Sequence, residues 1–247
     1  MDSLLTSATP FTVIFLRHLF LCLGSLSCLG PALAGRPLQT EDAGVLEPRA
    51  CELEGASLHL RDQSARSREM GLALGCGIGW RSQLSIGIAR MQEDGERTRI
   101  AQLGGKTWLW QGSGDQAPAI AVAWALGALR KDHHDDWHHA SADVNLVASL
   151  PVGTNTVHLN LGHARDVPSR LVATTWGAAI EHPGVDLAGV NWAPMAEIFG
   201  DDRESPWWNL ALRATVIPDR LYFDVSYGRA VRPDAPRLIT AGFKIAF

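Results

Sequence analysis

The residues with the clearest potential for chemistry lie in one short run, Asp132-His133-His134-Asp135-Asp136-Trp137-His138-His139. Imidazole and carboxylate groups are ligands for zinc, copper and nickel. In an extended chain, residues i and i+2 face the same side. The sequence therefore makes four histidines candidate metal ligands: His133, His134, His138 and His139. The spacing does not require a closed tetrahedral site, so a solvated loop with incidental metal affinity is the alternative.

Cysteine chemistry is a second candidate. Of the four cysteines, only Cys51 and Cys76 lie beyond the N-terminal apolar region. If the intervening turn is centred between residues 63 and 64, Cys51 lies opposite Cys76 on paired strands. A cross-strand disulfide can then form in an oxidising compartment. Two free thiols that pack as small hydrophobic groups are the alternative.

Catalysis is not expected. Ser85, Ser149 and His158 fall on the polar faces of predicted strands, but no spacing links a nucleophile, a base and an orienting acid. The glycine-rich run Gly75–Gly79 lies inside an alternating strand. There it indicates close backbone approach or curvature better than a nucleotide-binding loop. The sequence predicts no enzyme activity and no cofactor.

The elements that position these residues are predicted to be strands. At the C-terminus, Leu238–Phe247 alternates between an apolar face and a face of small or polar residues, and it ends on Phe247. This period of two recurs along the chain, with turn residues between the segments. Twelve strands are predicted: Cys51–Leu60, Arg68–Trp80, Arg81–Met91, Arg97–Gln111, Ala119–Arg130, Ala142–Leu150, Thr156–His163, Leu171–Glu181, Leu187–Gly200, Trp208–Ile217, Leu221–Arg229 and Leu238–Phe247.

The predicted fold class is all-β, an antiparallel transmembrane β-barrel. Strands of about 9–11 residues match a tilted bilayer crossing. A twelve-stranded barrel with its apolar face inside would leave voids, because side chains this small could not fill it. Tryptophans near the strand ends also resemble an interfacial girdle. These are Trp80, Trp108, Trp110, Trp192, Trp207 and Trp208.

The start of the chain is predicted to be a cleaved signal peptide, residues 1–34, because an apolar run follows Arg17 and ends in an Ala-x-Ala pattern. Residues 35–49 form an irregular segment that could occupy the lumen, and residues 50–247 form the barrel. The formal net charge of -4 argues against a nucleic-acid partner.

The polar faces of the strands define the expected substrate path. The side chains expected to face the lumen are Glu52, Glu54, Asp143, His158, Glu197, Arg213, Asp224 and Lys244. Mixed charges could set a transverse field or pair across the lumen. The alternative is that these residues only solvate the interior.

A family resemblance is carried by Arg36–Ala43 and by Cys51–Glu54, which read Arg-Pro-Leu-Gln-Thr-Glu-Asp-Ala and Cys-Glu-Leu-Glu. These stretches resemble the mature start and first strand of outer-membrane transporters of the meta-pathway of phenol degradation. The resemblance implies a barrel that passes small molecules, aromatic or hydrophobic ones among them. Cys51 is not explained by that family's function.

The sequence therefore predicts an exported protein of the bacterial outer membrane, with both termini in the periplasm because the strand number is even. It is expected to act as a passive channel for small solutes. The alternative is a closed barrel with a structural, binding or adhesive role, through outer loops such as Lys131–His139. Expected partners are membrane lipid, a small-molecule solute and the barrel-assembly machinery, which would read Phe247.

Overall fold

The computed structural model describes residues 37–247, apart from 63–64, 115–116 and 133–135. The segments in which apolar residues alternate with small or polar ones form strands throughout this part of the chain. The strands are β1 (Cys51–Arg61), β2 (Arg66–Gly79), β3 (Ser82–Glu93), β4 (Glu96–Gln111), β5 (Ala119–Lys131), β6 (His138–Val152), β7 (Asn155–Asp166), β8 (Leu171–Glu181), β9 (Val185–Leu187), β10 (Val190–Asp201), β11 (Trp207–Ile217), β12 (Leu221–Ala230) and β13 (Arg237–Ala246).

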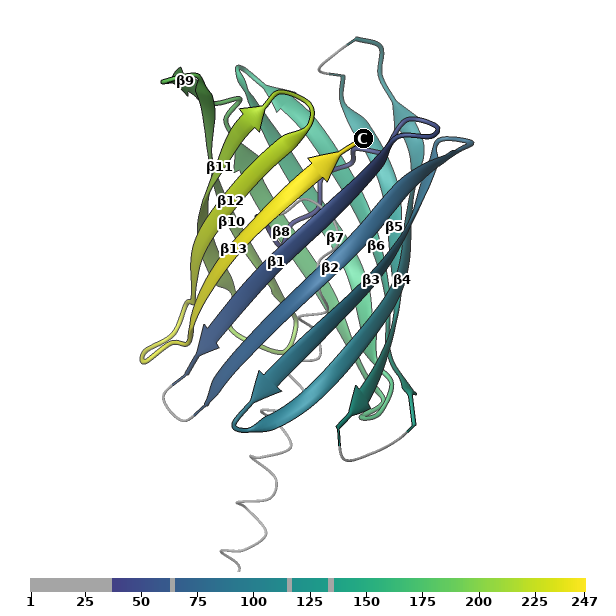
Figure 1. Ribbon diagram of the computed structural model, residues 1–247, viewed down its shortest axis with the longest axis vertical. Helices are drawn as coiled ribbons and strands as arrows, with labels where there is room; N and C mark the ends of the chain where they lie inside the picture. Colours follow the sequence, from purple (N-terminus) through teal and green to yellow (C-terminus); the bar gives the residue numbers. More distant parts are fainter. Residues whose placement is uncertain (1–36, 63–64, 115–116, 133–135) are drawn as a thin grey trace, which may run out of the picture.

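Twelve of these strands form a closed antiparallel barrel, as the sequence predicts (Figure 1). Each strand pairs with its neighbours in chain order, and β13 returns to pair with β1. The short β9 pairs only with β10 and extends the β8–β10 connection. Closure is completed by two backbone hydrogen bonds between Cys51 and Phe247, of 2.8 and 2.9 Å. The last strand therefore hides both edges of the sheet.

The described residues contain no helix that is long and apolar enough to cross a membrane. The outer face of the barrel is instead largely apolar. Large side chains such as Ile86, Ile88 and Leu161 are 59–67% exposed there. The inward positions of the strands carry mostly alanine, glycine and polar residues, among them Ala121 of β5 and Glu197 of β10. An apolar outer face around a polar interior is the pattern of a barrel whose outer face meets lipid.

The first hairpin has the register that its sequence predicts. Cys51 lies opposite Cys76 and Leu53 lies opposite Leu74. The sulfur atoms of Cys51 and Cys76 form a disulfide, with the Cα atoms 4.2 Å apart. This bond ties the start of β1 to β2 at the point where the chain enters the sheet.

Two details of the tryptophan prediction are wrong. Trp108 and Trp110 lie on opposite faces, because a β-bulge in β4 shifts the register between them. Trp110 is half exposed on the outer face, whereas the indole of Trp108 points inward and donates to the carbonyl of Ala43. Trp207 stacks on Phe199, whose position in β10 also faces inward. Trp108 and Trp207 therefore do not belong to an outer girdle.

Pro194 lies inside β10 although proline has no N–H to donate to a ladder, a feature of the sequence that favours a bulge there. The structure has no bulge at this position. The register of β10 with β11 continues through Pro194↔Leu212 without a shift. On the other side of β10, residues 190–192 pair with β9, and residues 195–201 pair with β8. The proline therefore lies at a change of partner strand, where a missing N–H donor interrupts no continuous ladder.

The disulfide leads to a stability prediction. Replacing both Cys51 and Cys76 by serine is expected to lower the free energy of unfolding by about 3 kcal/mol, because the unfolded chain regains the entropy of a loop of roughly 25 residues. Urea titration of the folded barrel in detergent measures this, with and without dithiothreitol. Reduction should shift the midpoint of the native chain and leave the double variant unchanged. Equal midpoints for both chains would contradict the prediction.

Candidate functional site: the lumen and its N-terminal segment

All eight residues that the sequence assigns to the lumen lie at inward-facing positions of the barrel. Several are direct cross-strand neighbours there: Glu54↔Lys244 and Arg213↔Asp224. The Lys244 ammonium lies 2.7 Å from a Glu52 carboxylate oxygen and 3.8 Å from one of Glu54. The other lumen residues, Asp143, His158 and Glu197, lie on β6, β7 and β10.

The interior also holds the chain that precedes β1. We call residues 37–50 the N-terminal segment. It follows the inner wall strand by strand, and its contacts move around the barrel as its residue numbers rise. In chain order, its partners are Asn209 and Glu197 on β11 and β10, Asn160 on β7, Ser149 on β6, Lys106 and Trp108 on β4, Gln83 on β3, and Gly77 on β2. The segment therefore lines part of the lumen as a second layer, visible inside the barrel in Figure 1.

Glu197 anchors the beginning of the segment. Its carboxylate accepts the backbone N–H of Gln39 at 2.9 Å and that of Thr40 at 2.7 Å. Asn209 donates its amide to the same carboxylate at 2.8 Å. The Glu197 residue is only 5% exposed. A buried carboxylate is stabilised here by donors from both the segment and the wall, and the segment's backbone is satisfied by a charged acceptor.

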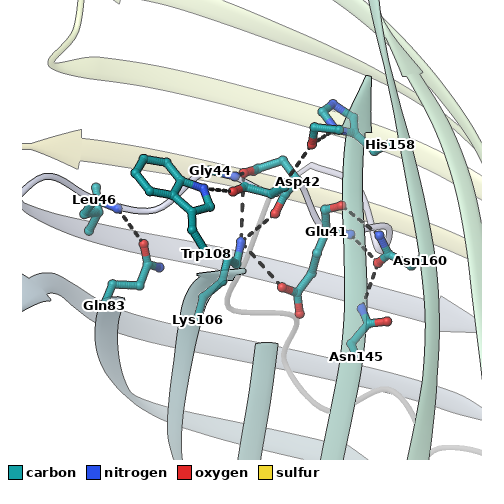
Figure 2. Close-up of polar contacts among 12 residues, drawn as sticks. Glu41, Asp42, Gly44, Leu46, Gln83, Lys106, Trp108, Asn145, His158 and Asn160 are labelled. Carbon is teal, nitrogen blue, oxygen red and sulfur yellow. Dashed lines mark hydrogen bonds and ion pairs between the residues drawn. The ribbon is translucent and has the colours of Figure 1, made fainter. Parts of the chain in front are cut away.

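Lys106 anchors the middle of the segment (Figure 2). Its side chain is 4% exposed, and its ammonium donates to the backbone carbonyl of Asp42 at 2.7 Å. The same ammonium lies 3.5 Å from a Glu41 carboxylate oxygen and 3.9 Å from one of Asp42. One buried cation from β4 therefore meets two carboxylates and a carbonyl from the segment, an arrangement that compensates its burial.

The two segment carboxyls differ in their electrostatics, and both lie outside the membrane-spanning strands. Burial raises the pKa of Glu41, and the attraction of Lys106 does not fully offset it. Burial also raises the pKa of Asp42, but attraction by Lys106, Lys244 and His158 outweighs burial and lowers this pKa to about 2. The pKa values of these neighbouring carboxyls therefore move in opposite directions, although both groups lie within 4 Å of the same ammonium.

Amide and indole groups complete the attachment. Asn160 accepts the backbone N–H of Glu41 and donates to its carbonyl, both at 2.8 Å, and Asn145 donates to Asn160 at 2.9 Å (Figure 2). Farther along, Gln83 accepts the backbone N–H of Leu46 at 2.8 Å. Backbone groups of a segment without secondary structure thus find side-chain partners on the wall, as buried backbone must.

Ser149, His158 and Glu181 come together although no sequence spacing linked them. The Ser149 hydroxyl oxygen lies 2.8 Å from Nδ1 of His158, and Nε2 of His158 lies 3.4 Å from a Glu181 carboxylate oxygen. Ser149 also accepts the backbone N–H of Ala43 at 2.8 Å. Ser149 is thus a further anchor of the segment, and its hydroxyl also bonds to His158.

Gly77 is the point where the segment touches the wall most closely. Pro48 forms a parallel bridge to Gly77, and backbone hydrogen bonds of 3.0 and 2.9 Å join Gly77 to Arg49 and Ala50. A Cβ at position 77 would overlap the backbone oxygens of Leu46 and Glu47. The sequence interpretation of this glycine run as a mark of close backbone approach is therefore confirmed at Gly77.

Substitution of Gly77 gives a prediction with a matched control in the same strand. Gly77→Ala should displace the end of the segment and speed amide hydrogen exchange at residues 45–50 by roughly tenfold, as expected from overpacking against a backbone. Gly75→Ala is the control, because its Cβ would lie at an ordinary 3.7 Å from its nearest neighbours, among them Leu46. Equal exchange in the two variants would refute the close contact.

The sector formed by β12, β13 and β1, together with Arg213 of the neighbouring β11, carries a second polar group. In this group an arginine and a lysine lie near one aromatic ring. The Tyr222 ring has Arg213 5.9 Å from its centroid on one side and Lys244 6.0 Å on the other. Lys244 in turn pairs with Glu52 and Glu54. This sector presents mixed charge and one aromatic surface to the lumen.

The predicted metal site gains no support within the part of the chain that the structure describes. His133 and His134 lie outside the described residues, and His138 and His139 are exposed at the start of β6. His139 is 3.0 Å from the carbonyl of Ser141. Among the described residues, no group of three or more His, Cys, Asp or Glu side chains is placed to hold a metal ion.

Comparisons with known proteins agree on the fold. The chain is similar to the KdgM porin, with a TM-score of 0.55, 10% identity, and coverage of 78% of this chain and 99% of that one. It is similar to an outer-membrane channel from Pseudomonas putida F1, with a TM-score of 0.55, 11% identity, and coverage of 83% and 98%. It is also similar to the β domain of the Bordetella autotransporter BrkA, with a TM-score of 0.51, 13% identity, and coverage of 81% of this chain and 99% of that one.

The fold is that of outer-membrane barrels. No protein family and no curated protein matches the chain in sequence. At 10–13% identity, these structural neighbours establish a shared architecture and leave the solute open.

Proposed function

We propose that this protein is a bacterial outer-membrane channel that conducts small solutes passively, through a lumen narrowed by the N-terminal segment. The observation that carries the proposal is the polar interior. Charged and amide side chains line a closed barrel whose outer face is apolar, and part of that wall is covered by the segment. A barrel with only a structural role has no need of a charged interior.

The solute path in this proposal follows the sector of β12, β13 and β1. Its inward side chains, among them Tyr222, Lys244 and Glu52, pair with one another. The segment's hydrogen bonds to the wall reach β11, β10, β7, β6, β4, β3 and β2. Mixed charges and an aromatic face favour small polar or aromatic solutes over large neutral ones.

Assignment to the transporters of the phenol meta-pathway belongs to this proposal as well. It is supported by residues 36–43 and 51–54, and by the architecture that the chain shares with porins and channels. The proposed orientation places both termini and Phe247 at the periplasmic rim, with the β5–β6 loop outside the cell.

Solute uptake by proteoliposomes tests the function. Liposomes carrying the folded barrel should admit small solutes such as phenol-derived carboxylates and pentoses, faster than trisaccharides and faster than protein-free liposomes. A folded barrel that admits none of them would reject the channel. That result would favour the alternative, a closed barrel that acts structurally or binds partners through its outer loops.

A further inference from the structure

Arginines gather on the outer face of the barrel at the end opposite the termini. We call seven of them the arginine arc: Arg229, Arg237, Arg61, Arg66, Arg90, Arg99 and Arg130. They lie on consecutive strands of the barrel, β12, β13 and β1 to β5. Each occupies an outward position. Arg90 alternates in phase with the exposed Ile88 of its own strand, and Arg61 is the cross-strand partner of the outward Arg66 and Arg237.

The arc places like charges directly opposite one another. Arg61 is the cross-strand partner of both Arg66 and Arg237, and Arg237 is also the partner of Arg229. On the neighbouring strands, Arg99 is the partner of both Arg90 and Arg130. Directly opposed side chains have Cβ atoms about 4.5–5.5 Å apart, and like charges in such pairs are destabilising. Five such pairs on one face call for a bound anion that bridges them.

The chain itself supplies few anions at this level. Asp132 lies 3.6 Å from Arg99, and Asp94 accepts the backbone N–H of Arg66. Both carboxylates belong to the turns beyond the strands. The outward positions of the seven strands that carry the arc hold no Asp or Glu among the described residues. Arg130 also lies 5.6 Å from the centroid of the Trp137 ring, and the β1–β2 turn adds Asp62, which lies 3.7 Å from Arg232. These groups meet part of the arc, and its remaining charge needs partners from outside the chain.

The arc borders the lipid-facing surface directly. Met70, which is 53% exposed, lies opposite Arg90, and Ile88 in the next outward position of that strand is 67% exposed. At the other end of the barrel, the outward positions of β2 and β13 are apolar to the rim, as at Ile78 and Ile245. The arginines Arg81 and Arg220 at that end belong to turns and not to outward strand positions. Basic side chains that only extend toward an interface would occupy outward strand positions at both ends. A one-sided arc indicates a ligand confined to one leaflet.

We propose that the arginine arc binds the phosphate groups of a phosphorylated glycolipid headgroup in the outer leaflet of the outer membrane. Guanidinium groups bind phosphate oxygens in bidentate fashion, and two arginines opposed across a ladder can share one phosphate. The lipid's acyl chains would lie against the apolar belt beside Met70 and Ile88. The proposal rests on the outer-membrane location proposed above, and it is independent of whether the lumen conducts.

Native mass spectrometry of the folded full-length chain in detergent micelles tests this site. Bisphosphorylated lipid A is compared with the same lipid after complete removal of its phosphates, and inorganic phosphate is added as a competitor. The Arg90→Gln/Arg99→Gln variant removes two of the three arginines that oppose one another on β3, β4 and β5. The matched control is Arg165→Gln/Arg220→Gln, which removes two exposed arginines that lie outside the arc. Heat-modifiable mobility on gels verifies that each variant is folded.

We expect bisphosphorylated lipid A to bind at least about tenfold more tightly than the dephosphorylated lipid, the size of a charge-assisted hydrogen bond. The arc variant should lose about tenfold in affinity, and the control should match the native chain. Equal binding of both lipids, or an arc variant equal to the control, would overturn the proposal. Displacement of the lipid by millimolar inorganic phosphate would also overturn it, since the site would then be one for free phosphate. A non-conducting barrel that still discriminates the two lipids would reject only the channel function.

Discussion

Glu197→Ala is expected to release the beginning of the N-terminal segment from the wall. The substitution removes the acceptor of the Gln39 and Thr40 N–H groups and of the Asn209 amide in one step. Hydrogen bonds to a charged group contribute about 1.5–3 kcal/mol each, and buried donors left without partners add a further cost. We therefore expect attachment of residues 37–42 to weaken by about 3 kcal/mol or more.

Hydrogen exchange of the peptide containing residues 38–44 measures this release. Glu197→Gln keeps one oxygen acceptor and should show an intermediate rate. Gln102→Ala serves as the matched control, because this inward side chain of β4 has an unpartnered Oε1 and contributes no acceptor to the segment. Protection that is unchanged in Glu197→Ala would show that the carboxylate does not hold the segment.

Lys106→Met is expected to weaken the attachment of the middle of the N-terminal segment to the wall. It leaves the carboxylates of Glu41 and Asp42 without the cation that lies within 4 Å of both, and it removes the donor to the Asp42 carbonyl. Removing one partner of a buried pair costs about 3–5 kcal/mol, and we expect about 2–3 kcal/mol here because the carboxylates keep partial access to water.

A double-mutant cycle isolates this interaction. Adding Glu41→Gln and Asp42→Asn to Lys106→Met should recover most of the lost protection, because the uncompensated charges are then gone. Lys131→Met, an exposed lysine at the end of β5, is the control and should behave as the native chain. If Glu41→Gln and Asp42→Asn do not restore the segment's protection from hydrogen exchange, Lys106 acts through packing and not through charge.

The fold could be predicted from local pattern, because alternation defines both the strands and their two faces. The β1–β2 hairpin shows how far this reaches: a symmetric turn places Cys51 opposite Cys76 without further information. Alternation does not predict the faces of Trp108 and Trp110 correctly, because one bulged residue between them exchanges the inward and outward positions of the rest of β4. Nothing in the alternation of β4 marks that extra residue.

Only part of the lumen site could be predicted from the sequence. The inward residues follow from strand parity, so Glu197 and Lys244 could be assigned to the interior. The partner of Glu197 could not, because the contact joins residues 158 positions apart through a segment with no periodicity. Lys106, Asn160 and the Ser149–His158 pair were missed as anchors for the same reason. Gly77 was the one local signal, since a glycine inside a strand indicates a backbone that approaches closely.

Single-channel recording in planar bilayers tests the central claim most directly, with the full chain compared with a chain that lacks residues 37–46 and retains the disulfide. The full chain should give discrete conductance steps, and the shortened chain should give steps several-fold larger, because the second layer along the wall is gone. Two silent barrels, each verified as folded, would contradict the channel. Equal conductance of the two chains would contradict the role of the N-terminal segment in narrowing the lumen.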